Sequence, residues 1–245
     1  MPVLLLAQGD LPAKNLLKSA IKARYGMKPP ILNSVRLDFR GRASVKVGRA
    51  RRFVPVDATA LFRFPNAMRL DFVLRPPGRM AQRIIESTDG AHFYYTPDGK
   101  SPRLVTDSQH QHSMVRRMWM LANLMLVPMS DMHVRLTETG PRNFKATHIR
   151  YNDSVQVTLD GIHRLDHMQV HCLNPRLMRQ QAYTIALAKQ QLDVDGLRLP
   201  SKMRVYWGKT PAMELAPYTV EQDITIPDSI FRVAYEGNII STVGA

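Results

Sequence analysis

The sequence predicts a mainly β (α+β) protein, in which a single curved antiparallel sheet forms an open half-barrel with helices on its concave face. Three observations lead to this fold class. Apolar and polar residues alternate without interruption over residues 35–47, as in a long strand. Shorter alternating segments separated by turn residues fill residues 58–100. Residues 11–25 and 113–126 instead have the apolar spacing of helices.

Residues 11–25 are predicted to form the first helix. Apolar residues recur there at helical spacing, lysines lie beside them, and Gly26 is a natural helix end. The strand predicted at 35–47 would extend about 43 Å at ~3.3 Å per residue, roughly twice a usual strand. A strand of that length in a globular domain has to curve, and Gly41 at its middle is the expected bend.

The segment after this strand is predicted to be an antiparallel meander. Alternating runs end at the turns Pro65-Asn66, Asp89-Gly90 and Pro97-Asp98-Gly99. The helix predicted at 113–126 follows, and Pro128 is expected to stop it. Further strands are predicted at 145–151, 155–159, 165–172, 182–186, 198–207 and 220–226.

The charge of the chain is strongly positive and unevenly distributed. The formal net charge is +14 over 245 residues, and the window Lys14–Arg52 holds twelve cations but one acid, Asp38. Such a window could be a solvated outer face, or it could bind an anionic membrane surface, a lipid headgroup or nucleic acid. The sequence has no zinc-finger, RNP or helix-turn-helix pattern, so we expect no nucleic acid partner.

The first residues have two interpretations. Residues 1–8 are apolar and read either as the remnant of a secretion signal, with Ala7 before the cleavage point, or as an ordinary lead-in to the first helix. Residues 9–245 are then expected to form one domain. The lone cysteine, Cys172, is predicted to be a buried strand residue without a disulfide partner in the chain.

The motifs of common enzyme classes are missing from the sequence. There is no HExxH, GxSxG or glycine-rich phosphate loop, so we predict that the protein is not an enzyme. His163, His167 and His171 would lie ~13 Å apart along one strand, too far to share a metal ion. His110 and His112 have a chelating spacing but no further ligand near them, which favours a polar surface loop.

The helix predicted at 113–126 is unusually rich in methionine. Methionine side chains are flexible and polarizable, and they are frequent on apolar surfaces that bind varied ligands. On a concave sheet, an apolar helix is either a plug that fills the core or a lid over a lipid-sized pocket. Both alternatives are consistent with the spacing.

The order of these segments resembles the LolA-like family of periplasmic lipoprotein carriers. FRFPNAMRLDF (62–72) is similar to the strand–Pro–strand segment of that family. STDGAHFYYTPDGK (87–100) is similar to its hairpin, and VDGLRLPSKMRVY (194–206) to a later strand. The resemblance covers roughly Leu11 to Phe231. It implies an open β half-barrel with helices over its mouth, an apolar cavity that holds acyl chains of lipids or lipoproteins, and no cofactor.

One position departs from the family pattern. The carriers have an arginine directly before the proline of the strand–Pro–strand segment, and that arginine ties the lid shut. Phe64 stands at this place here, with Arg69 further along. Latching by this residue is therefore not implied for this chain.

The expected function is a non-catalytic carrier of the cell envelope, periplasmic or secreted and monomeric, that binds acyl chains. Its basic window, Lys14–Arg52, would contact an anionic membrane surface. The alternative is a basic structural or interaction module that binds a protein partner or an anionic surface. The residues expected to line the lipid-binding cavity are Phe62, Phe64, Leu70, Phe72, Met114, Met118, Trp119, Leu121 and Met125.

Overall fold

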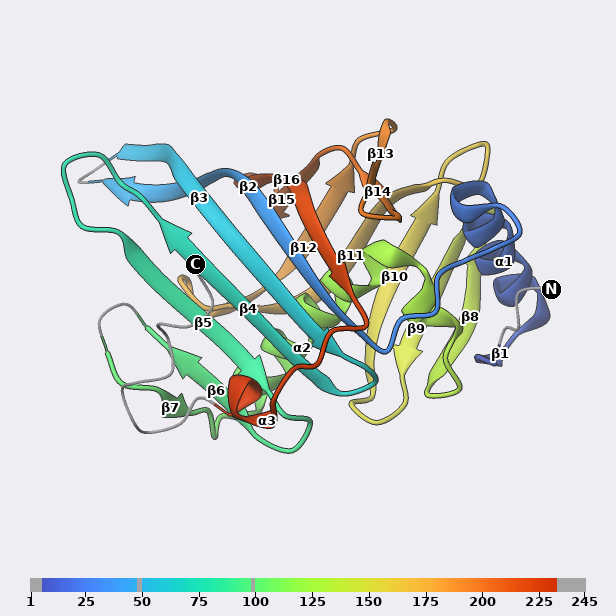
Figure 1. Ribbon diagram of the computed structural model, residues 1–245, viewed down its shortest axis with the longest axis horizontal. Coiled ribbons are helices and arrows are strands. Elements are labelled where there is room, and N and C mark those ends of the chain that lie inside the picture. The colour runs from blue at the N-terminus through green and yellow to red at the C-terminus, as the bar shows by residue number, and fades with distance from the viewer. Residues whose placement is uncertain (1–5, 48–49, 98–99, 233–245) are drawn as a thin grey trace.

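A computed structural model describes residues 6–47, 50–97 and 100–232 (Figure 1). In these residues the strands form one curved sheet of 14 strands, which is not closed into a barrel, and a separate hairpin of β13 (Gln191–Val194) and β14 (Leu197–Pro200). Neighbouring strands of the large sheet are antiparallel, apart from the parallel pair β1–β8. In order across the sheet, they are β1 (Gln8–Gly9), β8 (Val134–Gly140), β9 (Asn143–His148), β10 (Asp153–Leu159), β11 (Leu165–Asn174), β12 (Arg179–Leu187), β15 (Met203–Trp207), β16 (Thr210–Gln222), β2 (Ser34–Val47), β3 (Ala50–Arg63), β4 (Ala67–Leu74), β5 (Gln82–Thr88), β6 (Phe93–Thr96) and β7 (Arg103–Leu104).

The long strand predicted from residue 35 is confirmed as β2, and it pairs with β3 along its whole length, from Ser34↔Arg63 to Val47↔Ala50. Gly41 lies where β16 approaches closely, since a Cβ atom there would come within 1.9 Å of the Glu214 carbonyl oxygen. A side chain at this position would push the two strands apart, so the close contact with β16 requires glycine here.

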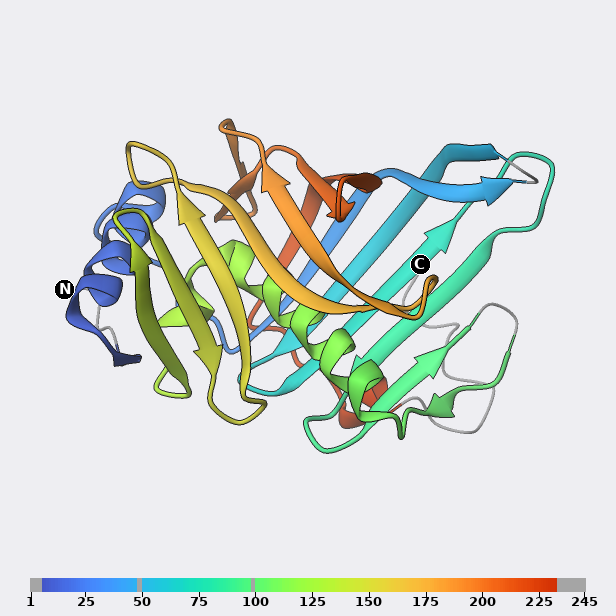
Figure 2. The ribbon, with the colours of Figure 1, turned by 180° about the vertical axis from the view of Figure 1, so that it is seen from behind.

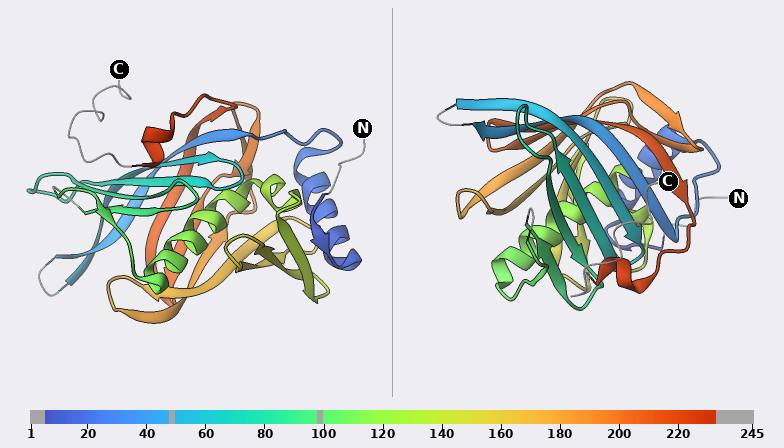
Figure 3. Two further views of the ribbon diagram at one scale, coloured as in Figure 1. Left: turned by 90° about the horizontal axis from the view of Figure 1, so that it is seen from below. Right: turned by 60° about the vertical axis from the view of Figure 1, so that its left-hand side comes forward.

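Two helices lie on the concave face, as predicted. The helix α1 (Leu11–Tyr25) packs against β8 and β9 at one end of the sheet through Ala13, Leu17 and Ile21. The helix α2 (Ser108–Ala122) lies across the concave side and contacts β10, β11 and β4 (Figure 2). Seen from below, α2 lies inside the half-barrel while α1 lies at its end (Figure 3).

The predicted boundaries of the second helix need correction. α2 begins at Ser108, five residues before the predicted start, because the Asp107 side chain caps it by accepting from the His110 backbone N–H. His110 and His112 are therefore in a helix, and the prediction of a polar loop there is wrong. Pro128 does not stop α2 itself. The helix ends at Ala122, the 3₁₀ turn η1 (Asn123–Met125) follows it, and Pro128 lies in the second 3₁₀ turn, η2 (Val127–Ser130).

Three strand predictions also differ from the structure. The segment predicted as one strand at 198–207 is divided between β14 and β15, which belong to different sheets. β16 begins at Thr210, ten residues before the strand predicted at 220–226, and ends at Gln222. β8 was not predicted, because its apolar Val134 and Leu136 are followed by a polar run. Ala7 is buried beside this strand, and residues 1–5 of the predicted signal remnant lie outside the described residues.

A short segment crosses the convex face of the sheet. Ile226 and Phe231, the latter in the one-turn helix α3 (Asp228–Phe231), form a separate apolar cluster with Ala67 of β4. Arg69 donates to the Ile230 carbonyl oxygen at 2.7 Å, and Arg63 pairs with Asp228 at 2.6 Å. Arg69 therefore fastens this convex segment, on the face opposite the helices.

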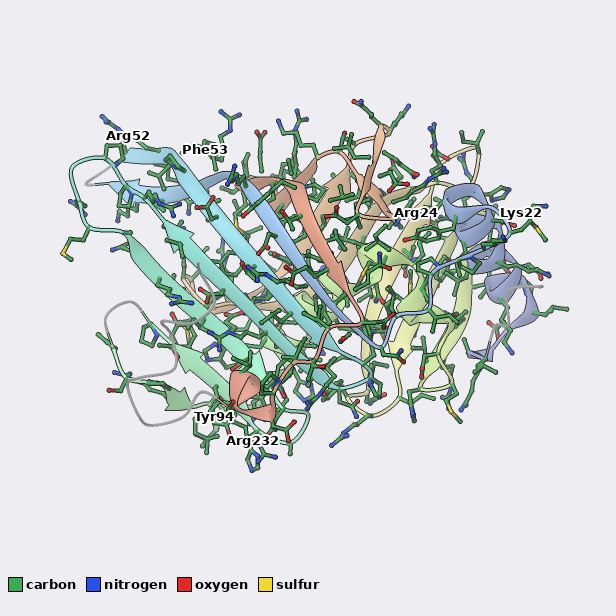
Figure 4. All side chains as sticks on the ribbon, viewed as in Figure 1. Lys22, Arg24, Arg52, Phe53, Tyr94 and Arg232 are labelled. Atoms are coloured by element: carbon green, nitrogen blue, oxygen red, sulfur yellow. The ribbon has the colours of Figure 1, made fainter. Side chains whose placement is uncertain are left out.

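The basic window Lys14–Arg52 does not form one surface. Lys22 on α1 and Arg52 at the start of β3 lie at opposite ends of the long axis (Figure 4). Between them, Arg42 forms an ion pair with Glu214 on the convex face at 2.9 Å, and Arg24 is buried. No helix in the described residues is long and apolar enough to span a bilayer.

Candidate functional site

An apolar groove of about 710 Å³ opens between α1, the loop from Gly26 to Asn33, the turn between β3 and β4, and η2. Its volume is within the range of small-molecule and cofactor sites, about 300–1,000 Å³. The described residues that line it are mainly apolar. They are Leu6, Ile21, Met27, Lys28, Pro29, Pro30, Ile31, Leu32, Asn33, Phe64, Pro65, Trp119, Val127, Pro128, Ser130, Asp131, His133, Val134 and His148.

The loop over this groove is shaped by local sequence. Gly26 ends α1 with a φ of 69°, a conformation that glycine adopts at little cost. Pro29 and Pro30 restrict the backbone that follows, and the Phe64 N–H donates to the Asn33 carbonyl oxygen at 2.9 Å. The loop is thus fastened at both ends, while Met27 and Ile31 between them are 62% and 80% exposed.

Three aromatic rings, those of Trp119, His148 and Tyr151, contact one another at the floor of the groove. His148 lies edge-on to Trp119 at 5.5 Å between ring centroids and beside Tyr151 at 4.6 Å. Its Nε2 is 3.4 Å from the carbonyl oxygen of Pro65, whose peptide bond with Phe64 is cis, and Tyr151 Oη donates to the Asn66 carbonyl oxygen at 2.8 Å. These contacts join the β3–β4 turn to the β9–β10 end of the sheet, across the opening of the half-barrel.

Burial changes the acid–base properties of these rings. Desolvation lowers the pKa of His148, which is 2% exposed, and its Nδ1 has no hydrogen-bond partner among the described residues. Desolvation likewise raises the pKa of Tyr151 to about 12. Both rings are therefore neutral at neutral pH, which suits a site for an apolar ligand.

A second, much smaller cavity of about 20 Å³ lies under α2. The sheet contributes apolar residues such as Leu70 and Phe72, and α2 contributes Leu121 and Arg117. Arg117 donates to the buried Glu86 carboxylate on β5 at 2.9 Å, so its charge is balanced. At about 20 Å³, this cavity has room for little more than a single water molecule.

The nine predicted cavity residues are divided among three places. Phe64 and Trp119 line the groove. Leu70, Phe72 and Leu121 line the small cavity under α2. The other four are fully buried in the core, at 0% exposure: Phe62, Met114, Met118 and Met125. The methionine side chains of α2 thus fill the concavity along much of the helix, and the groove opens beyond its end.

The loop at residues 26–33 was not among the predicted site residues, although it supplies much of the groove. Its sequence, GMKPPILN, lacks any periodicity and follows a helix, so it reads as a connection. The signal that could have identified it is its apolar content, since a loop with Met27, Ile31 and Leu32 is unusually hydrophobic for an exposed connection.

Polar contacts hold the helices against the sheet and against each other. Asp153, at the start of β10, accepts from Arg116 at 2.7 Å and lies 2.9 Å from His112 Nδ1. The buried Arg24 of α1 donates to the Leu124 carbonyl oxygen in η1, and Tyr25 Oη donates to that of Met125 at 2.9 Å. No group of three or more potential metal-ligating side chains gathers in the part of the chain that the structure describes.

No protein-family model matches the chain, and no curated protein sequence matches it. Solved structures do. A DUF1329 family protein from Desulfovibrio piger has a TM-score of 0.50 and 9% identity, over 90% of this chain and 97% of that one. A LolA superfamily protein from Nitrosomonas europaea has a TM-score of 0.49 and 13% identity, over 91% and 98% of the two chains. A candidate outer membrane lipoprotein-sorting domain from Vibrio parahaemolyticus has a TM-score of 0.46 and 10% identity, over 82% and 89%.

At such identities the comparison concerns the fold alone. The DUF1329 structure and the curved, unclosed sheet with helices inside it agree with the half-barrel that the sequence predicts.

Proposed function

We propose that the protein is a non-catalytic carrier of the cell envelope that holds an acyl chain of a lipid or lipoprotein in the groove beneath the loop 26–33. The apolar lining of this 710 Å³ groove is the observation that carries the proposal. A cavity of this size with few polar groups suits a hydrocarbon chain better than a polar metabolite. Met27 and Ile31 can rearrange around chains of different length, since they are exposed at its rim.

The polar groups of the groove suit the end of such a ligand. Lys28, Asp131 and His133 are the titratable side chains at its lining besides the neutral His148. A headgroup or the polypeptide of a lipoprotein would lie near them, with the acyl chain against Trp119 and Phe64. Asp131 Oδ1 already accepts from the backbone N–H of His133 at 2.8 Å, and we propose a binding role for these groups and no reaction.

The organisation of the chain fits this function. We propose that residues 9–245 act as one domain, because the described helices all pack on the same sheet, and that the protein acts as a monomer. The lid function predicted for the second helix would apply to a rearranged state, in which α2 moves and the acyl chain enters the space now occupied by Met114 and Met118.

Trp119 allows a direct test. The chain has two tryptophans, and Trp207 lies on β15, away from the groove lining. A Trp207→Phe variant has Trp119 as its sole tryptophan, so a fatty acid brominated along its chain should quench the emission strongly when it occupies the groove. The matched control is Trp119→Phe, in which Trp207 should be quenched little. Saturating brominated acid that leaves Trp119 unquenched, or quenches both tryptophans equally, would refute the proposal.

A further inference from the structure

Four lysines cluster at the groove end of the molecule. Lys14, Lys18 and Lys22 follow each other at four-residue steps and so lie on one side of α1. Lys14 and Lys18 are seven and three residues before Ile21, the residue of α1 that lines the groove, so they lie near it on the helix surface. Lys28 is itself part of the lining. Among the residues that the structure describes, no carboxylate lies within ion-pairing distance of the four.

Apolar side chains are exposed at the same end. Met27, Ile31 and Leu6 line the groove and yet are 62%, 80% and 54% exposed, and Leu11 in the first turn of α1 is 69% exposed. Exposed apolar residues gathered at one place mark a surface that contacts another apolar phase or partner. Lysines beside such residues are typical of segments that lie at the surface of an anionic bilayer.

The remaining cations of the basic window differ in their surroundings. Arg42 on the convex face shares Glu214 with Lys202 and Arg204, at 2.9, 3.1 and 3.3 Å, so part of this charge is compensated. Arg51 and Arg52 are exposed at the start of β3, at the end of the molecule far from α1 (Figure 4). Both ends of the molecule therefore carry positive charge, but only the end with α1 combines that charge with the apolar groove.

We propose that the end formed by α1 and the loop 26–33 docks on an anionic lipid bilayer, with the four lysines at the headgroups and with Met27 and Ile31 in the interfacial layer. This inference rests on the proposed carrier function, because docking in this orientation turns the groove toward the membrane. An acyl chain could then pass between bilayer and groove without crossing water. Within the Lys14–Arg52 window, only Lys14, Lys18, Lys22 and Lys28 then contact the membrane.

Binding to vesicles tests the orientation. Cosedimentation with phosphatidylcholine vesicles, with and without phosphatidylglycerol, would be compared for the double variants K18Q/K22Q and R51Q/R52Q, each of which removes two positive charges. With about 1 kcal/mol per lysine near an anionic surface, K18Q/K22Q should bind anionic vesicles about 10–30-fold more weakly, while R51Q/R52Q should bind nearly as the parent protein does. Ile31→Gln should also weaken binding, in contrast to Met178→Gln at a position 72% exposed elsewhere.

Three outcomes would overturn the inference. Equal losses in the two double variants would mean that net charge alone attracts the protein. Equal binding of the parent to neutral and anionic vesicles would show that the lysines do not contribute to membrane binding. No vesicle binding at all would leave this end for an acidic protein partner. The Trp119 quenching assay with a monomeric brominated fatty acid needs no vesicle, so it tests the groove separately: its failure would refute the carrier, and its success beside absent vesicle binding would refute the docking alone.

Discussion

Arg117 of α2 donates to Glu86 of β5 at 2.9 Å, and both side chains are about nine-tenths buried. This ion pair joins the helix to the sheet at the small cavity beneath it. Near the groove, the contacts of Trp119 with His148 join the same helix to the end of the sheet. The position of α2 is thus set by a charged contact in its middle and an aromatic contact closer to its end.

Removing one partner of the buried ion pair should destabilise the protein strongly. Glu86→Gln leaves the buried guanidinium of Arg117 without a carboxylate, and Arg117→Met leaves the buried carboxylate of Glu86 without a cation. Each change should lower the free energy of unfolding by about 3–5 kcal/mol. The double variant E86Q/R117M should lose less than the sum of the two single losses, because neither charge is then left unpaired. Urea denaturation of the four proteins measures this, and strict additivity would contradict the proposed coupling.

Truncating Met118 tests whether α2 fills the core on the concave side of the sheet as a plug. Its side chain is 0% exposed, so Met118→Ala should leave a cavity and cost about 2–5 kcal/mol of stability. The control is Met178→Ala, at a position 72% exposed, which should change the free energy of unfolding little. A small loss of stability for Met118→Ala, together with weaker uptake of an acyl probe, would instead indicate that this part of α2 faces space that the ligand fills.

Gly41 should tolerate no side chain. Because a Cβ atom would come within 1.9 Å of the Glu214 carbonyl oxygen, Gly41→Ala forces β2 and β16 apart and should cost at least about 1–3 kcal/mol. Gly161→Ala is the matched control, since the nearest atom to its Cβ is 3.6 Å away on the flexible Arg142 side chain. Thermal unfolding of both variants decides the matter, and equal melting temperatures would contradict the close approach.

The sequence predicts those parts of this fold in which a local pattern coincides with burial. The helix at 11–25 is recovered to the residue, and the long strand differs from β2 by one residue at its start. β3 was found only in its second half, because Arg51, Arg52 and Pro55 hide the alternation of its first half. The division of 198–207 between two sheets depends on Ser201 and on partners elsewhere in the chain, which no local pattern specifies.

The candidate site was harder to predict than the fold. The two predicted residues that line the groove, Phe64 and Trp119, lie in regular segments or directly beside them. His148 reaches the groove through a contact with a residue more than 80 positions away, Pro65. The loop 26–33 is held there by the hydrogen bond from Phe64 to Asn33, which likewise joins residues that are distant in the sequence. Side-chain facing within a strand also cannot be read reliably from alternation, since a slip of one residue exchanges the two faces.

Stability should fall on the acid side because of His148. Desolvation, together with the nearby charges of His133 and Arg150, lowers its pKa in the folded protein, while Asp131 and the Pro65 carbonyl oxygen act in the opposite direction. The folded state therefore binds this proton less readily than the unfolded chain, whose histidine titrates near the ordinary value of about 6.5. By linkage, stability is complete above that value and decreases as the pH falls through it, until the folded-state pKa is reached.

A variant that cannot titrate at this position isolates the effect. His148→Phe keeps an aromatic ring between Trp119 and Tyr151 and should flatten the loss of unfolding free energy between about pH 7 and pH 5. Protonation of His148 in the folded protein, which begins only near its lowered pKa, would place a charge at the groove. The affinity for a brominated fatty acid should therefore decrease at a lower pH than the stability does in the parent, and this decrease should be absent in His148→Phe. Identical pH profiles for the parent and His148→Phe would assign the acid sensitivity to other groups.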